Sequence, residues 1–256
     1  MAEANPNRFD FGAAISGTFA AFAQNWALYI GLAALFVTLP TLLAGWGLML
    51  LTQSDPTADL RAADLIDTYA KAAVASIGSG AVRGAVIYGA GAHFAGRRAS
   101  ASQCLSTGMR EWFPLFGQSW LAGLAIGAAS LALIVPGIIL AMMWYVIGPV
   151  RVLERREVTA CFGRSADLTR GHRWILFGFA ILVSVMTFFV SLLIGFAIGL
   201  GIGLTGGAPA FTQMGQLVAV PLAYLLTFPF EAAASASAYN QLAPTGEAEQ
   251  LAQVFA

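Results

Sequence analysis

Two residues of opposite charge, Arg83 and Glu231, fall within long apolar stretches of the sequence. A charged side chain at the centre of a bilayer costs about 2.5–3.5 kcal/mol on insertion scales, so it is normally turned towards protein or water. We therefore expect the two side chains to neutralise each other across two membrane helices. Two interpretations stay open: a path for a proton or a substrate, or an ion pair that fixes the register of the helices.

The segment from Arg151 to Arg173 holds the densest cluster of charge in the chain. Cys161, Ser165 and Leu168 fall on one helical face within it, which predicts an amphipathic surface helix. Each basic residue near an anionic membrane surface contributes about 1 kcal/mol to binding. An alternative is that these arginines only set the orientation in the membrane. The candidate contacts for lipid headgroups or a protein partner are Arg151, Arg155, Arg156, Arg164, Arg170 and Arg173.

The sequence contains no motif for catalysis, for a metal or for a cofactor. His93 and His172 have no partner at metal-ligand spacing, and neither HExxH nor CxxC occurs. Residues 201–206 match GxGxxG, but no strand precedes them, as a nucleotide site requires. Cys104 and Cys161 are expected to be reduced and inert. We therefore expect no enzymatic activity, no cofactor and no nucleic-acid partner.

The composition is that of a membrane protein. Of the 256 residues, 58% are hydrophobic and 10% are charged, with a mean hydropathy of +0.74. Soluble domains average about 45–50% apolar and about 25% charged residues. A membrane-spanning helix takes about 20 apolar residues, so several such runs nearly exhaust the chain. The sequence predicts a single all-α integral membrane domain over residues 1–256, with six transmembrane helices and amphipathic interfacial helices.

Amphipathic helices and turns are expected around the spans. Residues 9–24 form an apolar stripe typical of a helix lying in the interface; the alternative is that they are the first turns of the first span. A second interfacial helix is expected around Trp112, and Pro136-Gly137 is expected to form the turn between the third and fourth spans. The run around Arg83 is rich in small residues, which let a neighbouring helix approach closely. The predicted spans are residues 27–51, 72–96, 113–135, 138–153, 174–204 and 214–238.

Glycine and proline spacing gives further expectations for the spans. Gly195, Gly199 and Gly203 are four residues apart and form overlapping small-xxx-small repeats, which predict a helix-packing face. Pro40 is expected to kink the first span, and Pro149 to bend or end the fourth.

Positive charge is distributed unequally between the two sides of this topology. Both termini and the connections after the second and fourth spans share one side, which carries ten of the thirteen Lys and Arg residues. By the positive-inside rule that side is cytoplasmic. We therefore expect cytoplasmic N- and C-termini. The ten residues are Arg8, Arg97, Arg98, Arg110, Arg151, Arg155, Arg156, Arg164, Arg170 and Arg173.

Three runs of the sequence carry a resemblance to a known family. They are FAAFAQNWALYIGLAALFVTLP, LALIVPGIILAMMWYVIGPVRVLERREVTACFGRSADLTRGHRWILFGFAIL and SASAYNQL. They resemble the membrane domain attached to some bacterial glycerophosphodiester phosphodiesterases, and related stand-alone bacterial inner-membrane proteins of unknown function. This resemblance implies a helical domain of a bacterial inner membrane with no established activity, because the soluble phosphodiesterase domain has no counterpart here. The matching features are Pro136-Gly137, Pro149-Val150 before Glu154, Arg164-Ser165, and Leu168 followed by Gly171 and Trp174.

The lack of a catalytic constellation favours a non-enzymatic integral inner-membrane protein that acts as an interaction or envelope-maintenance module. The alternative is a small transporter or lipid-handling protein, with a path lined by Pro-broken helices and by Arg83 and Glu231. An intramembrane enzyme acting on lipids is a third possibility without a residue set behind it. The expected partners are the lipid bilayer, its anionic headgroups, and a membrane or cytosolic protein.

Overall fold

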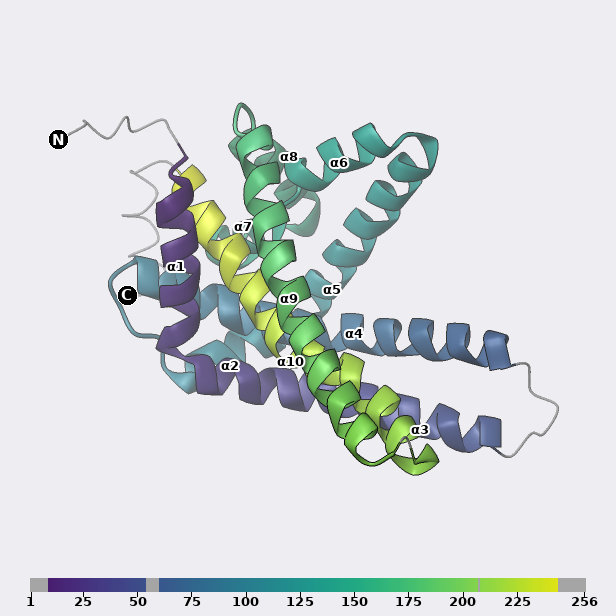
Figure 1. Ribbon diagram of the computed structural model, residues 1–256. Helices are drawn as coiled ribbons and strands as arrows, with labels where there is room; N and C mark the ends of the chain where they lie inside the picture. Colours follow the sequence, from purple (N-terminus) through teal and green to yellow (C-terminus); the bar gives the residue numbers. More distant parts are fainter. Residues whose placement is uncertain (1–8, 54–59, 207, 244–256) are drawn as a thin grey trace.

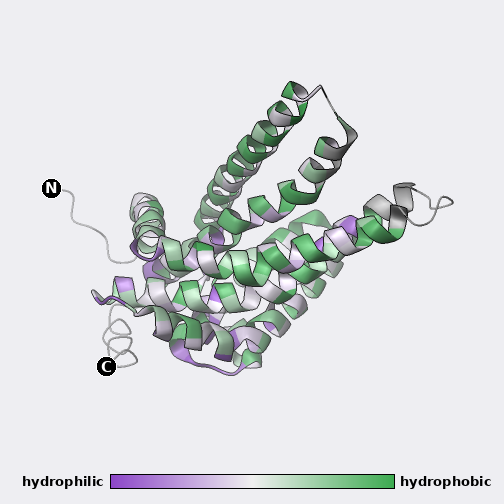
Figure 2. Ribbon diagram, turned by 90° about the horizontal axis from the view of Figure 1, so that it is seen from below, coloured by the Kyte–Doolittle hydropathy of each residue, from purple (hydrophilic) through white to green (hydrophobic). Residues whose placement is uncertain are grey.

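The computed structural model describes residues 9–53, 60–206 and 208–243, which are almost entirely helical and include no strand. Six helices are long and apolar enough to cross a membrane, so the predicted fold class is confirmed. Figure 2 shows hydrophobic residues along these helices. The six are Trp26–Leu51, Leu65–Phe94, Ala101–Ala132, Ile134–Glu154, Arg173–Leu204 and Leu217–Leu242.

The spans form three helical hairpins that share a base and diverge towards their tips (Figure 1). The first pairs α2 (Trp26–Ala33), η1 (Ala34–Thr38) and α3 (Leu39–Gln53) with α4 (Leu60–Phe94). The second pairs α5 (Ala101–Ala132) with α6 (Ile134–Met143), and the third pairs α9 (Arg173–Leu204) with α10 (Pro209–Leu242). The base is completed by α1 (Phe11–Gln24), α7 (Ile147–Glu154) and α8 (Val158–Leu168).

Helix α4 is the centre of the fold because its small residues admit its neighbours closely. Gly78 lies against the backbone of Phe36 in η1, and Gly84 lies against Gly108 of α5. Among the six spans α4 is the most buried inside the protein and α9 the least. Close packing around the run that contains Arg83 is therefore confirmed.

The first span changes to π-helical geometry just before Pro40. The N–H of Leu39 donates to the carbonyl of Ala34, which is the i to i+5 bond that defines this geometry. The hydroxyl of Thr38 then donates to the carbonyl of Pro221 in α10 at 3.2 Å. The disturbance expected around Pro40 thus takes the form of a π-helical segment bonded to the last span.

Two predicted connections around α5 are wrong. The helix runs unbroken through the expected interfacial segment, and it begins at Ser100, whose side chain and Gln103 form a reciprocal capping box. The turn between α5 and α6 is Leu133, in an extended conformation (φ −157°, ψ 138°), and not Pro136-Gly137. Pro136 lies in the first turn of α6, where its missing N–H leaves no hydrogen bond unmade.

The fourth span, predicted as continuous over residues 138–153, is interrupted. Residues 144–146 form a turn between α6 and α7, and Pro149 lies in the first turn of α7. A proline ring clashes with the carbonyl four residues earlier in a continuous helix; for Pro149 that residue is Tyr145. The helix therefore breaks around Tyr145, before the proline rather than at it.

Helix α1 is separate from the first span, which confirms the helix predicted over residues 9–24 and contradicts the alternative. The carboxylate of Asp10 caps it by accepting from the N–H of Ala13 at 3.0 Å, and the chain leaves helical geometry at Asn25 (φ −133°). Small residues of α1, among them Ala14, form its buried face, while Phe19 is exposed. Its place in the membrane interface stays a prediction.

Candidate ligand cavity

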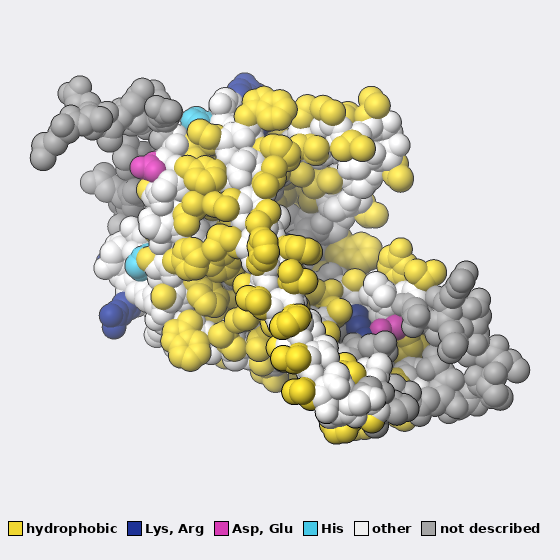
Figure 3. Space-filling model, viewed as in Figure 1, with side chains coloured by type: hydrophobic (Ala, Val, Ile, Leu, Met, Phe, Trp, Pro, Cys, Tyr) yellow, Lys and Arg dark blue, Asp and Glu magenta, His cyan; other side chains and the backbone are white. Residues whose placement is uncertain are grey.

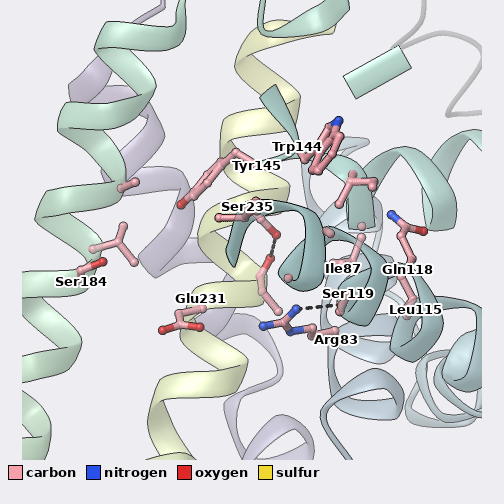
Figure 4. Close-up of a pocket in the computed structure, with 18 residues that line it drawn as sticks. Arg83, Ile87, Leu115, Gln118, Ser119, Trp144, Tyr145, Ser184, Glu231 and Ser235 are labelled. Atoms are coloured by element: carbon pink, nitrogen blue, oxygen red, sulfur yellow. Dashed lines mark hydrogen bonds between the residues drawn. The ribbon is translucent and has the colours of Figure 1, made fainter. Parts of the chain in front are cut away.

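A cavity of about 410 Å³ lies where the three hairpins diverge. Binding sites for small molecules typically have volumes of about 300–1,000 Å³. Its walls come from α4, α5, the turn before α7, α9 and α10 (Figure 4). Hydrophobic side chains are spread over much of the face shown in Figure 3. The cavity, in contrast, is lined by the hydroxyl-bearing Tyr145 and by six polar side chains: Arg83, Gln118, Ser119, Ser184, Glu231 and Ser235.

Arg83 and Glu231 each lie about three helical turns before the end of their helix. Arg83 is eleven residues before the end of α4 at Phe94, and Glu231 is eleven residues before the end of α10 at Leu242. At 1.5 Å per residue, each charge is about 16 Å along its helix from the base. Helices α4 and α10 come together near the base, where Gly17 of α1 faces both Phe94 and Ser237. Both charges therefore lie well inside the membrane-spanning part.

Arg83 and Glu231 share this cavity but do not form the expected ion pair in the described structure. Nη1 of Arg83 donates to Oγ of Ser119 at 3.2 Å, and its guanidinium lies 5.9 Å from the ring centroid of Phe228. Glu231 is exposed and extends from α10 towards Ser184 of α9 (Figure 4). The bond to Ser119 holds the guanidinium on the α5 side, whereas α10 directs the carboxylate to the α9 side. The two charges thus occupy opposite walls.

Gln118 of α5 is the most buried polar residue of the cavity wall. It is 1% exposed, and neither its amide nitrogen nor its amide oxygen has a hydrogen-bond partner among the described residues. An unsatisfied buried polar group costs about 1–3 kcal/mol, and because Gln118 is part of the cavity wall, we expect this amide to find its partner in an occupant of the cavity. Sequence analysis missed it, although Gln118-Ser119 is a polar pair in an otherwise apolar run.

An apolar groove of about 430 Å³ adjoins the cavity between α6 and α9. Ala180 and Ser184 line both spaces. The polar cavity and the groove therefore adjoin along α9. The remaining residues of the groove are Met142, Phe177, Ile181, Val185 and Phe188.

A second apolar space, of about 460 Å³, lies between α1, α9 and α10. Phe19, Phe22 and Phe230 are part of its wall, and it has no lining residue in common with the polar cavity. Its walls offer almost no polar atoms, so it lacks a place for a headgroup.

At the base, the Arg151 side chain forms an ion pair and a hydrogen bond within the protein. Its Nε pairs with Oε2 of Glu111 in α5 at 2.7 Å, and the Glu111 and Arg151 side chains are 6% and 20% exposed. Its Nη1 donates to the carbonyl of Arg156 at 2.5 Å. The side chain thus joins α5, α7 and the turn before α8, and it is not presented to headgroups.

Glu154 at the end of α7 is a second centre of charge. Its carboxylate pairs with Arg156 at 2.5 Å and with Arg164 of α8 at 3.1 Å, and it accepts from the hydroxyl of Tyr239 in α10 at 3.0 Å. Two more of the predicted headgroup contacts are therefore occupied within the fold. The sequence could not indicate Tyr239 as a partner, because it lies 85 residues away.

The other predicted contact residues are less constrained. Arg155 ends α7 in the left-handed conformation (φ 52°) and is exposed. The Arg170 side chain is 78% exposed and lies 3.4 Å from Asp167. Arg173 is half-buried, and its Nε has no partner among the described residues. Headgroup contact by these three residues stays a prediction.

Helix α8 is amphipathic as predicted, with Cys161, Ser165 and Leu168 as its buried face. The hydroxyl of Ser165 donates to the carbonyl of Met143 at 2.8 Å and so gives a hydrogen-bond partner to the last carbonyl group of α6. Burial raises the pKa of the Cys161 thiol to about 11, against the smaller opposing effect of Arg151. Because the thiolate is the reactive form, this thiol is unreactive near neutral pH.

The three glycines predicted to form a helix-packing face are exposed on α9: Gly195, Gly199 and Gly203. A Cβ on any of them would meet no other described element within 4 Å. Instead α9 packs through Ile202 onto Gly215 of α10. The glycine repeats are thus not used within the described chain because α9 lies at the edge of the fold.

No family model, curated protein or solved structure matches this chain. The resemblance to the phosphodiesterase-associated membrane domain therefore stays a prediction. Among the described residues, no group of three or more His, Cys, Asp or Glu side chains is arranged to hold a metal ion.

Proposed function

We propose that this multi-pass membrane protein binds a membrane lipid between its three hairpins and acts in lipid handling. The observation that carries the proposal is that the charged cavity and the apolar groove adjoin at Ala180 and Ser184. An amphipathic molecule matches both parts, because its headgroup provides partners for the two charges and its acyl chain covers apolar side chains. A small soluble solute would leave the groove without a role.

The composition of the groove supports a lipid as the occupant. Ile181, Val185 and Phe188 are exposed on α9, so a chain lying along them stays continuous with the surrounding bilayer. Unsatisfied charges within a membrane are costly, and a headgroup beside Arg83 and Glu231 lowers that cost. The lipid-handling alternative from the sequence is therefore the function we favour.

The proposed location is the inner membrane of a bacterium, with the base of the hairpins and both termini in the cytoplasm. The positive-inside rule supports this orientation, because ten arginines belong to the terminal segments and connections on that side. A role as an interaction or envelope-maintenance module stays a prediction, since no feature of the described surface distinguishes a protein contact from a lipid contact.

Replacing Gln118 by leucine is expected to reduce the amount of lipid that stays bound after purification in a mild detergent. The substitution keeps the size of the side chain but removes both polar atoms, and each hydrogen bond contributes about 0.5–1.5 kcal/mol. Native mass spectrometry should show wild-type protein carrying bound lipid and a loss of about tenfold in affinity for Gln118→Leu. Arg83→Met should lose at least as much.

Arg98→Met is the matched control, because Arg98 is exposed at the base and belongs neither to the cavity wall nor to the predicted headgroup contacts. It should retain lipid as the wild type does, and melting temperatures should show that all variants are folded. Equal lipid retention by the wild type and by folded Gln118→Leu and Arg83→Met would contradict the proposed function.

A further inference from the structure

The two charges of the cavity wall sum to zero without touching each other. Arg83 is held on the α5 side by Ser119, and Glu231 extends from α10 towards α9 (Figure 4). A ligand with one charge would pair with one of them and leave the other uncompensated, which is costly for a charge within a membrane. A ligand that carries both a positive and a negative group compensates both.

We propose that the cavity selects a zwitterionic phospholipid with a primary ammonium group, its phosphate bound by Arg83 and its ammonium by Glu231. The inference rests on the proposed lipid-binding function and names the headgroup. Arginine suits the phosphate because its planar fork of five N–H groups matches phosphate oxygens. One of these groups donates to Ser119, which orients the fork towards the cavity.

The wall around Glu231 suits an ammonium with three N–H donors. Ser184 on α9 and Ser235, one helical turn after Glu231, line the same cavity. The hydroxyl of Ser235 donates to the carbonyl of Ala232 at 2.9 Å, so its oxygen lone pairs are directed to accept a further hydrogen bond. The Glu231 carboxylate and the hydroxyl of Ser184, towards which it extends (Figure 4), thus offer acceptors for the ammonium. A trimethylammonium group has no N–H to donate to them.

The position of the groove sets the direction of the lipid. Ser184 borders both the polar cavity and the groove, so the glycerol region is placed beside Ser184. One acyl chain then follows α9 past Val185 to Phe188. The headgroup points into the protein and the chain points outward between α6 and α9.

Competitive binding of three phospholipids with identical acyl chains tests the headgroup. Native mass spectrometry of detergent-solubilised protein should show phosphatidylethanolamine preferred about tenfold or more over phosphatidylglycerol and phosphatidylcholine, as expected for one charge-assisted hydrogen bond. Glu231→Gln should remove this preference without weakening phosphatidylglycerol. Arg83→Gln should weaken all three lipids. Ser184→Ala, a milder change, should lower only the preference for phosphatidylethanolamine, and Arg98→Gln, at an exposed position outside the cavity, should change nothing.

Several outcomes would overturn the inference. Equal binding of the three lipids to the wild type, or an unchanged preference in Glu231→Gln and Ser184→Ala, would contradict the headgroup assignment and leave lipid binding intact. Binding of none of the lipids would overturn the proposed function itself. Free phosphoethanolamine is tested as a further competitor. If it competes as strongly as the lipid, the ligand is a soluble phosphoamine and the groove does not hold an acyl chain.

Discussion

Glu111→Gln is expected to lower the free energy of unfolding by about 3–5 kcal/mol, the cost of leaving a buried charge without its partner. The Arg151 guanidinium pairs with this carboxylate at 2.7 Å, and both side chains are largely removed from solvent. Arg151 also bonds the turn before α8 through the carbonyl of Arg156, so the loss should loosen the contact between α5 and that turn. Unfolding by sodium dodecyl sulphate in mixed micelles measures the change.

The double variant Glu111→Gln with Arg151→Met tests whether the lost stability comes from the uncompensated charge. Removing both charges takes away the uncompensated group, so much of the lost stability should return. Arg170→Met is the matched surface control and should unfold like the wild type, because that side chain is 78% exposed. If Glu111→Gln unfolds no more readily than Arg170→Met, the ion pair does not hold α5 and α7 together.

Gly78→Ala is expected to destabilise the protein by at least about 1–3 kcal/mol, the usual range for overpacking. A Cβ at Gly78 would overlap the carbonyl oxygen of Phe36 and lie 2.7 Å from its carbonyl carbon. These are backbone atoms of the π-helical segment, which cannot rotate away as a side chain can. Helix α4 must therefore move, which would separate it from the first span. A fall in melting temperature in detergent measures this effect.

Gly117→Ala provides the control for helix propensity. Gly117 lies in α5, and a Cβ there meets no other described element within 4 Å. Alanine is favoured over glycine within helices by about 0.5–1 kcal/mol, so this variant should be as stable as the wild type or slightly more stable. Equal melting temperatures for the two alanine variants would show that α4 does not pack as closely as described.

Features set by hydropathy and local spacing were predictable. The six spans follow from apolar length, the close packing of α4 from its small residues, and the buried face of α8 from the spacing of Cys161, Ser165 and Leu168. The effects of proline on the helices were not predictable, because they depend on which turn of a helix contains the proline. Pro136 was expected in a turn but lies in the first turn of α6. Pro149 was expected near a helix end but follows a break.

For the candidate site, the sequence indicated the charges but not their arrangement. Charge within apolar runs identified Arg83 and Glu231 as members of a polar site, and both line the cavity. Whether they touch depends on the rotation of α4 and α10 about their axes, which local sequence does not encode. The polar pair Gln118-Ser119 carried a usable signal that was missed. Glu111 could not be paired with Arg151, because 40 residues separate them.

The most direct test of lipid binding is photolabelling with phosphatidylethanolamine that carries a diazirine at the middle of one acyl chain. Peptide mapping should place the label on Val185 and Phe188, along which the acyl chain is proposed to lie in the groove between α6 and α9. An excess of unlabelled lipid should compete, and Gln118→Leu should reduce the yield. Label spread evenly along the exposed face of α9, or gathered beside Phe19 between α1 and α10 and not competed, would contradict the site.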